Sequence, residues 1–131
     1  MGKLIFTKLN HHADKNFTCG NPSIDKKVRD SYFLTLIHRC YAYEVTTESG
    51  IVIAYYQIQF KRFPIMSFPE PIDEYSLDNY EDLYAFHIEY LAVRKEYQRR
   101  KIGSKVLQHI LGKIQSSHKD CPFRLVTINA L

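Results

Sequence analysis

The sequence contains no apolar run close to the roughly 20 residues that a membrane-spanning helix needs. The stretch from Met1 to Phe6 is only briefly apolar and has no small-residue cleavage pattern, so it is not expected to be a signal peptide. Cysteines are few, and none belongs to a C-x-x-C pair: they are Cys19, Cys40 and Cys121. This pattern argues against a disulfide framework and a zinc ribbon. We therefore expect a cytoplasmic protein with reduced thiols and no membrane contact.

Positive charge is missing from a long central stretch. No Lys or Arg lies between Phe63 and Val93, whereas seven acidic residues do. The following stretch, 94–105, reverses the balance with six basic residues and one acidic residue. Such segregation predicts an anionic ligand near 94–105 and a cationic one near the acidic segment 70–82, the alternative being two solvated surface runs. The adjacent pair His11-His12 has no third ligand at a suitable spacing, so no metal site is predicted.

The overall composition is typical of a globular protein, and the length predicts one domain, 1–131. Hydrophobic residues make up 45% and charged residues 24% of the 131 residues. Apolar patterning, with a turn signal at 48–50, predicts strands at 3–9, 41–46, 51–60, 84–93 and 123–129. The strand at 51–60 is apolar enough to be central in a sheet. The longest irregular connection, part of which is expected to be helical, is predicted at 61–83.

Two helices are predicted among these strands. One begins at Asn21, which can cap it, and Pro22, which suits the first helical position. Its apolar face follows helical spacing at Ile24, Val28 and Tyr32, and the apolar cluster at 33–37 either continues it or starts another helix. The second helix starts near Ile102 and carries an amphipathic stripe to Ile114.

The strand at 84–93 places two polar residues where an apolar strand is expected. Alternation predicts one apolar face made of Tyr84, Phe86, Ile88, Tyr90 and Ala92. The opposite face then holds His87 and Glu89 side by side, in a strand too apolar to lie at the edge of the sheet. Either this pair has a chemical role, or it is a buried carboxylate paired with a neighbour.

The basic turn and helix start that follow, 94–104, form a predicted anion cradle. The first N–H groups of a helix have no internal partner, and the helix dipole adds about half a positive charge there. Gly103 and Ser104 are small enough for a ligand to approach the backbone. A diphosphate is the natural ligand of such a turn.

This strand, turn and helix resemble the acyl-CoA N-acyltransferase superfamily (GNAT). Its signature, Gln/Arg-x-x-Gly-x-Gly/Ala, corresponds to the run from Gln98 to Ser104. Lys101 replaces the first glycine, and Ser104 replaces the second small residue. Lys101 is poorly suited to a positive φ, and its side chain either crowds the diphosphate or makes a charged contact with it. A second stretch, 17–25, is similar to the opening of the toxin-type branch, whose members pair with an antitoxin and acetylate aminoacyl-tRNA.

The resemblance implies roles for individual residues. It implies that pantetheine of acetyl-CoA pairs with the strand backbone at Leu91, Ala92 and Val93. The diphosphate contacts it implies are to Gln98, Arg99, Arg100, Lys101, Ile102, Gly103 and Ser104. A glutamate on this strand often acts as the general base, so Glu89 is the first candidate and His87 the second. The implied reaction moves an acetyl group to an amine of a small molecule, a protein or an aminoacyl-tRNA.

The implied fold class is α+β: a mixed, mostly antiparallel sheet flanked by helices, lacking the family's C-terminal helix and hairpin. The tyrosine that usually protonates the leaving thiolate belongs to that helix, so none is assigned, and we expect either a truncated chain or a natural remnant. Self-association is expected to cover the exposed sheet edge. Two alternatives stay open: a catalytically impaired remnant that binds CoA or a protein partner, and a nucleic-acid-binding module that uses 94–105.

Overall fold

Seven regular elements and one short 3-10 turn make up the described part of the chain. The computed structural model describes residues 2–64, 82–117 and 125–128. The strands are β1 (Ile5–Lys8), β2 (Tyr41–Thr46), β3 (Val52–Pro64), β4 (Asp82–Val93) and β5 (Leu125–Ile128). The helices are α1 (Pro22–Leu36) and α2 (Ile102–Ser117), and the 3-10 turn is η2 (Lys95–Tyr97). No helix in these ranges is long and apolar enough to cross a membrane.

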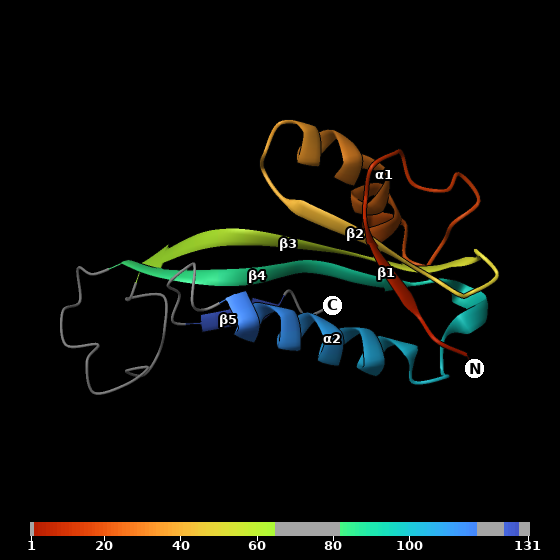
Figure 1. Ribbon diagram of the computed structural model, residues 1–131. Coiled ribbons are helices and arrows are strands. Elements are labelled where there is room, and N and C mark those ends of the chain that lie inside the picture. The colour runs from red at the N-terminus through yellow and green to blue at the C-terminus, as the bar shows by residue number, and fades with distance from the viewer. Residues whose placement is uncertain (1, 65–81, 118–124, 129–131) are drawn as a thin grey trace.

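The strands form one sheet in the order β1-β2-β3-β4-β5. The first four strands pair antiparallel, and β5 pairs parallel to β4. Helix α1 lies over one face of the sheet and α2 over the other (Figure 1). The predicted mixed, mostly antiparallel sheet with flanking helices is therefore confirmed, and the predicted central position of the strand at 51–60 is confirmed for β3.

A separate core fills the space under each helix. The α1 side buries residues from the N-terminal segment, the helix and three strands: Leu9, Phe17, Ile24, Val28, Ala42, Tyr55, Tyr90 and Ala92. The α2 side buries Val45, Ile53, Ala54, Tyr56, Ile58, Ile88, Ile102, Val106, Ile110 and Ile114. The apolar stripes that the residue spacing predicts on the two helices face these cores. This burial of apolar side chains is why both helices pack on the sheet.

The predicted bounds of the strand at 41–46 and the predicted start of α1 are confirmed, whereas the predicted bounds of the central connection are wrong. Helix α1 begins where expected, because the Asn21 side chain accepts hydrogen bonds from the N–H groups of Ser23 and Ile24. The helix runs on to Leu36, so the second apolar cluster continues it. The predicted irregular connection at 61–83 is too long, since 61–64 extend β3 and 82–83 extend β4. The rest of that connection, with its acidic residues, lies outside the described residues.

Strand β4 contains a bulge that alternation along the sequence did not predict. Gln57 of β3 pairs with Tyr90 and Ile58 pairs with Ile88, so Glu89 is an extra residue in the pairing register. An extra residue of this kind shifts the side-chain alternation by one. Ile88 therefore packs in the α2 core, whereas Tyr90 and Ala92 pack in the α1 core. The single apolar face predicted from Tyr84 to Ala92 is wrong beyond the bulge.

Candidate functional site

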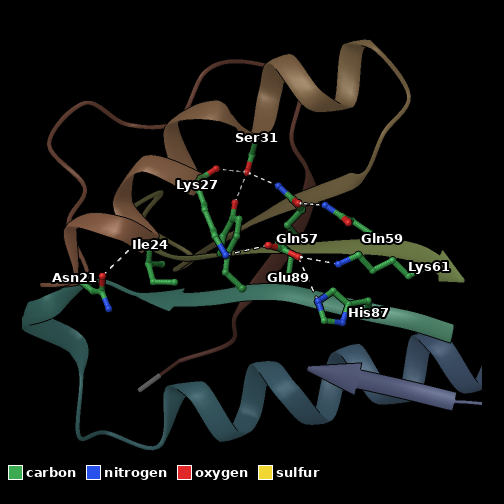
Figure 2. A network of polar contacts seen from close by, with 10 residues as sticks. Asn21, Ile24, Lys27, Ser31, Gln57, Gln59, Lys61, His87 and Glu89 are labelled. Atoms are coloured by element: carbon green, nitrogen blue, oxygen red, sulfur yellow. Dashed lines mark hydrogen bonds and ion pairs between the residues drawn. The ribbon is translucent and has the colours of Figure 1, made fainter. Parts of the chain in front are cut away.

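The bulged residue Glu89 is the centre of a polar cluster on the α1 side of the sheet. Its Oε1 lies 2.9 Å from Lys27 Nζ of α1. Its Oε2 lies 3.2 Å from His87 Nε2 and 3.9 Å from Lys61 Nζ of β3. Figure 2 shows the four side chains converging from α1, β3 and β4. The prediction that His87 and Glu89 share one face of the strand is confirmed by their contact.

The electrostatic surroundings keep the Glu89 carboxylate ionised. Its side chain is only 18% exposed, and burial alone raises its pKa. The hydrogen bond from Lys27 and the charges of Lys27, Lys61 and His87 outweigh burial, so the pKa of Glu89 falls below its usual value. His87 is buried as well, and its other ring nitrogen, Nδ1, lies 2.7 Å from Thr127 Oγ1 on β5. An ionised, oriented carboxylate of this kind can accept a proton from a cationic group.

A buried hydrogen-bond network sets the position of α1 relative to this cluster. The Ser31 hydroxyl donates to the Lys27 carbonyl at 2.8 Å and accepts from Gln57 Nε2 at 3.0 Å. It also contacts the Tyr90 hydroxyl, which donates because Ser31 has already given its single proton. Gln59 Nε2 extends the network by donating to Gln57 Oε1 at 2.9 Å. Ser31, Gln57 and Tyr90 are buried, so the helix turn that carries Lys27 is held firmly.

Sequence reasoning missed Lys27 and Lys61 as neighbours of Glu89, and it missed Ser31 as the residue that bonds the Lys27 carbonyl. Lys27 and Glu89 are separated by 62 positions in the sequence, and no local pattern connects them. One weak signal was present in β3, where Gln57, Gln59 and Lys61 recur with period two. Such spacing places polar side chains on one strand face. That face of β3 is the one that contributes Gln57, Gln59 and Lys61 to the network in Figure 2.

The basic turn before α2 has an unusual backbone. Arg99 has φ 65° and Lys101 has φ 61°, both in the left-handed region. Lys101 thus adopts the conformation that a glycine takes easily, although the sequence suggested that it would resist a positive φ. A residue with a side chain gives up roughly 1–2 kcal/mol there. The side chains of Arg99, Arg100 and Lys101 are exposed, so their charge surrounds the turn.

Two adjoining cavities begin at this turn. The first, of about 310 Å³, is lined by Val93, Tyr97, Gln98, Arg99, Lys101, Ile102, Gly103 and Ser104. The second, of about 280 Å³, is lined by Cys19, Asn21, Ile24, Leu91, Ala92, Val93 and Gln98. Val93 and Gln98 line both cavities, so the two spaces adjoin at the end of β4. Every residue predicted to contact the cofactor except Arg100 lines one of them.

Among the described residues, no strand pairs with one side of β4 beside these cavities. β5 pairs with β4 from Ala85 to Ile88, and no described residue pairs with β4 beyond that point on the β5 side. Among the described strands, the segment from Leu91 to Val93 is paired only with β3, and its Val93 carbonyl accepts a hydrogen bond from the Gln98 side chain. Its second edge can therefore hydrogen-bond an extended ligand.

The loop that precedes α1 is fastened to the basic turn. Gln98 Nε2 donates to the carbonyls of Cys19 at 2.7 Å and Val93 at 2.9 Å. The Asp25 carboxylate, in the first turn of α1, accepts from Thr18 Oγ1 of the loop at 2.7 Å and from the N–H of Cys19 at 2.9 Å. Gln98 therefore uses its side-chain amide to join β4 to this loop. The residues of the 17–25 stretch form one wall of the second cavity.

The basic run 94–105 does not act as one surface. Arg94 Nη2 lies 2.7 Å from Asp14 Oδ2, and Arg94 Nε donates to the carbonyl of Val52 at 2.7 Å. Its guanidinium also lies over the Phe17 ring, 5.4 Å from the ring centroid. Arg94 is therefore a structural residue that closes the α1 core. The charge left to meet a ligand comes from the exposed basic residues that follow Arg94.

The sequence from residue 9 to residue 127 matches the model of the acetyltransferase (GNAT) family. This match covers most of the chain, and the fold and the turn before α2 agree with it. The chain belongs to the GNAT family of acetyltransferases. No curated protein matches the sequence significantly.

Solved structures of toxin-type acetyltransferases share the fold. AtaT complexed with acetyl-methionyl-tRNAfMet superposes with a TM-score of 0.81 at 16% identity, covering 98% of this chain and 79% of AtaT. AtaTR bound with acetyl-CoA gives 0.80 at 17% identity, covering 100% and 79%. A tyrosine-to-phenylalanine mutant of KacT gives 0.84 at 14% identity, covering 99% and 79%. At these identities the likeness establishes the fold.

Proposed function

We propose that the chain transfers an acetyl group from acetyl-CoA to an amine, with the reacting atoms beside Glu89. The observation that carries the proposal is the order of features along β4. Two adjoining cavities extend from the basic turn along Leu91 to Val93, and the bulged Glu89 lies two residues before Leu91 in the same strand. An elongated ligand with a diphosphate at one end and an amide-containing arm fits this succession of anion cradle and unpaired strand edge.

Within this proposal, the backbone N–H groups at the start of α2 hold the diphosphate together with the exposed charges of Arg99 and Lys101. Gly103 leaves room for it, because a Cβ built there meets only Leu91 Cδ2 and Val93 Cγ2, each at 3.9 Å. Arg100 adds charge from outside the cavity, where its guanidinium lies over the Tyr97 ring. The backbone edge of Leu91 to Val93 orients the pantetheine arm, while the Val93 carbonyl is bound by Gln98 Nε2.

Glu89 is the group that accepts a proton from the attacking amine. Deprotonating a lysine amine at pH 7 requires about 4.6 kcal/mol, whereas an α-amine of pKa near 8 requires only about 1.4 kcal/mol. An ionised carboxylate with a lowered pKa is a weak base, which suits the α-amine better. His87 supports Glu89 from the same strand face and links it to Thr127.

The favoured acceptor is an aminoacyl-tRNA. Lys27 and Lys61 flank Glu89, so the site is rimmed by positive charge that suits a polyanionic acceptor carrying a weakly basic α-amine. The similar protein AtaT has been solved with acetyl-methionyl-tRNAfMet. AtaT has also been solved with the C-terminus of the antitoxin AtaR, which makes an antitoxin the corresponding partner to test.

Calorimetric titration with acetyl-CoA tests the cradle. Wild-type protein is expected to bind in the micromolar range, and Gly103→Phe is expected to lose about a hundredfold or more in affinity because the ring fills the diphosphate cavity. Gly112→Phe is the matched control, since Gly112 is on the same helix with nothing within 4 Å of its Cβ position. Equal affinities for the two variants would refute the cradle.

A thiol-release assay then tests the chemistry with three acceptors: an aminoacyl-tRNA, a polyamine and a lysine peptide. Preference for aminoacyl-tRNA supports the proposed acceptor, and preference for either alternative overturns it. Acetyl-CoA binding without release of thiol from any acceptor would favour the alternative of a chain that binds CoA without turnover.

We also propose that copies of the chain associate. Several large apolar side chains on the α2 side are exposed, among them Phe60, Tyr84, Val126 and Ile128. A patch of this kind on one face is usually covered by a partner. Light scattering at increasing concentration is expected to show a mass above that of the monomer, and a constant monomer mass would contradict this.

A further inference from the structure

Lys27 occupies the place beside Glu89 where an acceptor amine is expected. Its Nζ lies 2.9 Å from Glu89 Oε1, close enough for the ammonium to donate directly to the carboxylate. The Lys27 side chain is 35% exposed, so its amine is paired with the carboxylate and still reachable. The Ser31 bond to the Lys27 carbonyl holds this turn of α1 in place. The protein therefore presents one of its own primary amines to its candidate base.

We propose that Lys27 is a self-acetylation site: the chain transfers an acetyl group from acetyl-CoA to its own Lys27 Nζ. This inference rests on the proposed function, because it requires acetyl-CoA bound along the β4 edge. It goes beyond that function by naming a covalent modification and the residue that receives it.

The chemistry balances without any further reagent. The Lys27 ammonium gives one proton to the Glu89 carboxylate, and the neutral amine attacks the thioester carbonyl carbon. A C–N bond forms and the C–S bond breaks, so the acetyl group ends as an amide on Lys27. The Glu89 carboxyl returns its proton to the CoA thiolate, which becomes the thiol, and the second proton lost by the nitrogen passes to solvent, so Glu89 is ionised again. The higher barrier of a lysine amine makes this reaction slower than transfer to an α-amine.

Geometry separates Lys27 from the other lysines nearby. Lys61 Nζ lies farther from the carboxylate, at 3.9 Å from Oε2. Lys26, the neighbour of Lys27 on α1, is exposed and makes no ion pair among the described residues. Lys26 therefore measures background chemical acetylation in the same peptide. Modification of Lys27 would also remove the charge that pairs with Glu89 and leave an amide in the acceptor position.

The test is mass spectrometry of the protein after incubation with isotopically labelled acetyl-CoA, using a protease that does not cleave at lysine. Label is expected on Lys27 well above Lys26, and excess unlabelled CoA is expected to suppress only the Lys27 label. Lys27→Arg should abolish the label, while Lys26→Arg should leave the Lys27 signal unchanged. Glu89→Gln should slow labelling of Lys27 by about a hundredfold, the usual contribution of a general base.

Equal label on Lys26 and Lys27, label on Lys61 instead, or an unchanged rate in folded Glu89→Gln would each overturn the inference. Calorimetry and the acceptor assay distinguish this failure from that of the proposed function. Binding and turnover of an external amine without Lys27 label overturn the self-acetylation alone. Absence of acetyl-CoA binding overturns both. Circular dichroism of each variant establishes that it is folded.

Discussion

The two ends of strand β4 differ in what they offer a ligand. At the bulge, Glu89 is surrounded by side chains from α1, β3 and β4, and the arrangement depends on their charges (Figure 2). At the other end, the strand leads into a turn with Arg99 and Lys101 in the left-handed region and an open backbone edge. The first end depends on side-chain chemistry, and the second depends mainly on backbone conformation. Substitutions at the two ends should therefore affect different quantities.

The largest expected effect is on the rate of acetyl transfer. Glu89→Gln keeps the size of the side chain but removes its basicity, so kcat/KM should fall by about a hundredfold or more while acetyl-CoA affinity stays near the wild-type value. Thiol release and calorimetry on the same preparation measure the two quantities. A parallel loss of rate and affinity would show that the two ends of β4 are not separable.

A smaller effect is expected on the free energy of unfolding when the network behind Glu89 is cut. Ser31→Ala leaves the Gln57 amide and the Tyr90 hydroxyl buried without their shared acceptor, which should destabilise the fold by about 1–3 kcal/mol. Denaturant unfolding measures this. Ser116→Ala is the control, because Ser116 makes a similar bond to the Lys113 carbonyl from an exposed position. Similar losses in both variants would indicate that the buried network adds nothing.

At the turn, the expected effect concerns backbone strain. Lys101→Gly and Lys101→Ala both remove the charge, but only glycine relieves the left-handed conformation at φ 61°. The glycine variant should be more stable than the alanine variant by about 1 kcal/mol. Thermal or denaturant unfolding of the pair gives the difference. If the alanine variant is equally stable, the turn does not hold this residue in the left-handed region in solution.

The smallest expected effect is a pH dependence of the free energy of unfolding. It comes from His109 of α2, which lies at neither end of β4. The His109 ring stacks on Phe6 with centroids 3.6 Å apart, and burial together with the Lys113 charge lowers the pKa of His109 below 6.5. The unfolded chain thus binds this proton more readily. The contribution of His109 to the free energy of unfolding is fully present above pH 6.5, and it declines as the pH falls toward the lowered pKa.

His109→Gln should flatten that decline in unfolding experiments between about pH 7 and pH 5. His12→Gln, at an exposed position near the N-terminus, serves as the control. A wild-type slope retained in His109→Gln would assign the acid sensitivity to another group, such as the carboxylates whose pKa values are lowered.

Features that depend on local chemistry were predictable from the sequence. The cap at Asn21 and Pro22, the strand at 41–46 and the helix from Ile102 each follow from residue types at fixed spacing. The pairing of His87 with Glu89 also followed, because two residues on one strand face are neighbours whatever the rest of the chain does. The basic turn was recognisable because its sequence precedes an amphipathic helix.

Features that depend on contacts between distant segments were not predictable. Lys27 reaches Glu89 only because Ser31, Gln57 and Tyr90 fix the position of α1 on the sheet. Arg94 was counted with the basic ligand-binding run, yet its partner Asp14 is 80 positions away in the sequence. The bulge in β4 has no signature in the residue order, since it depends on the pairing register with β3.

The bulge makes one residue serve as both a charge and a spacer. Substituting Glu89 removes the carboxylate and leaves the count of residues in β4 unchanged. Deleting it would instead remove the bulge and restore simple alternation, with Tyr90 and Ala92 still in the α1 core and Leu91 and Val93 still against the α2 core. The two roles of Glu89 are therefore separable: substitution removes the carboxylate and keeps the bulge, whereas deletion removes both and leaves the neighbouring side chains on their present faces.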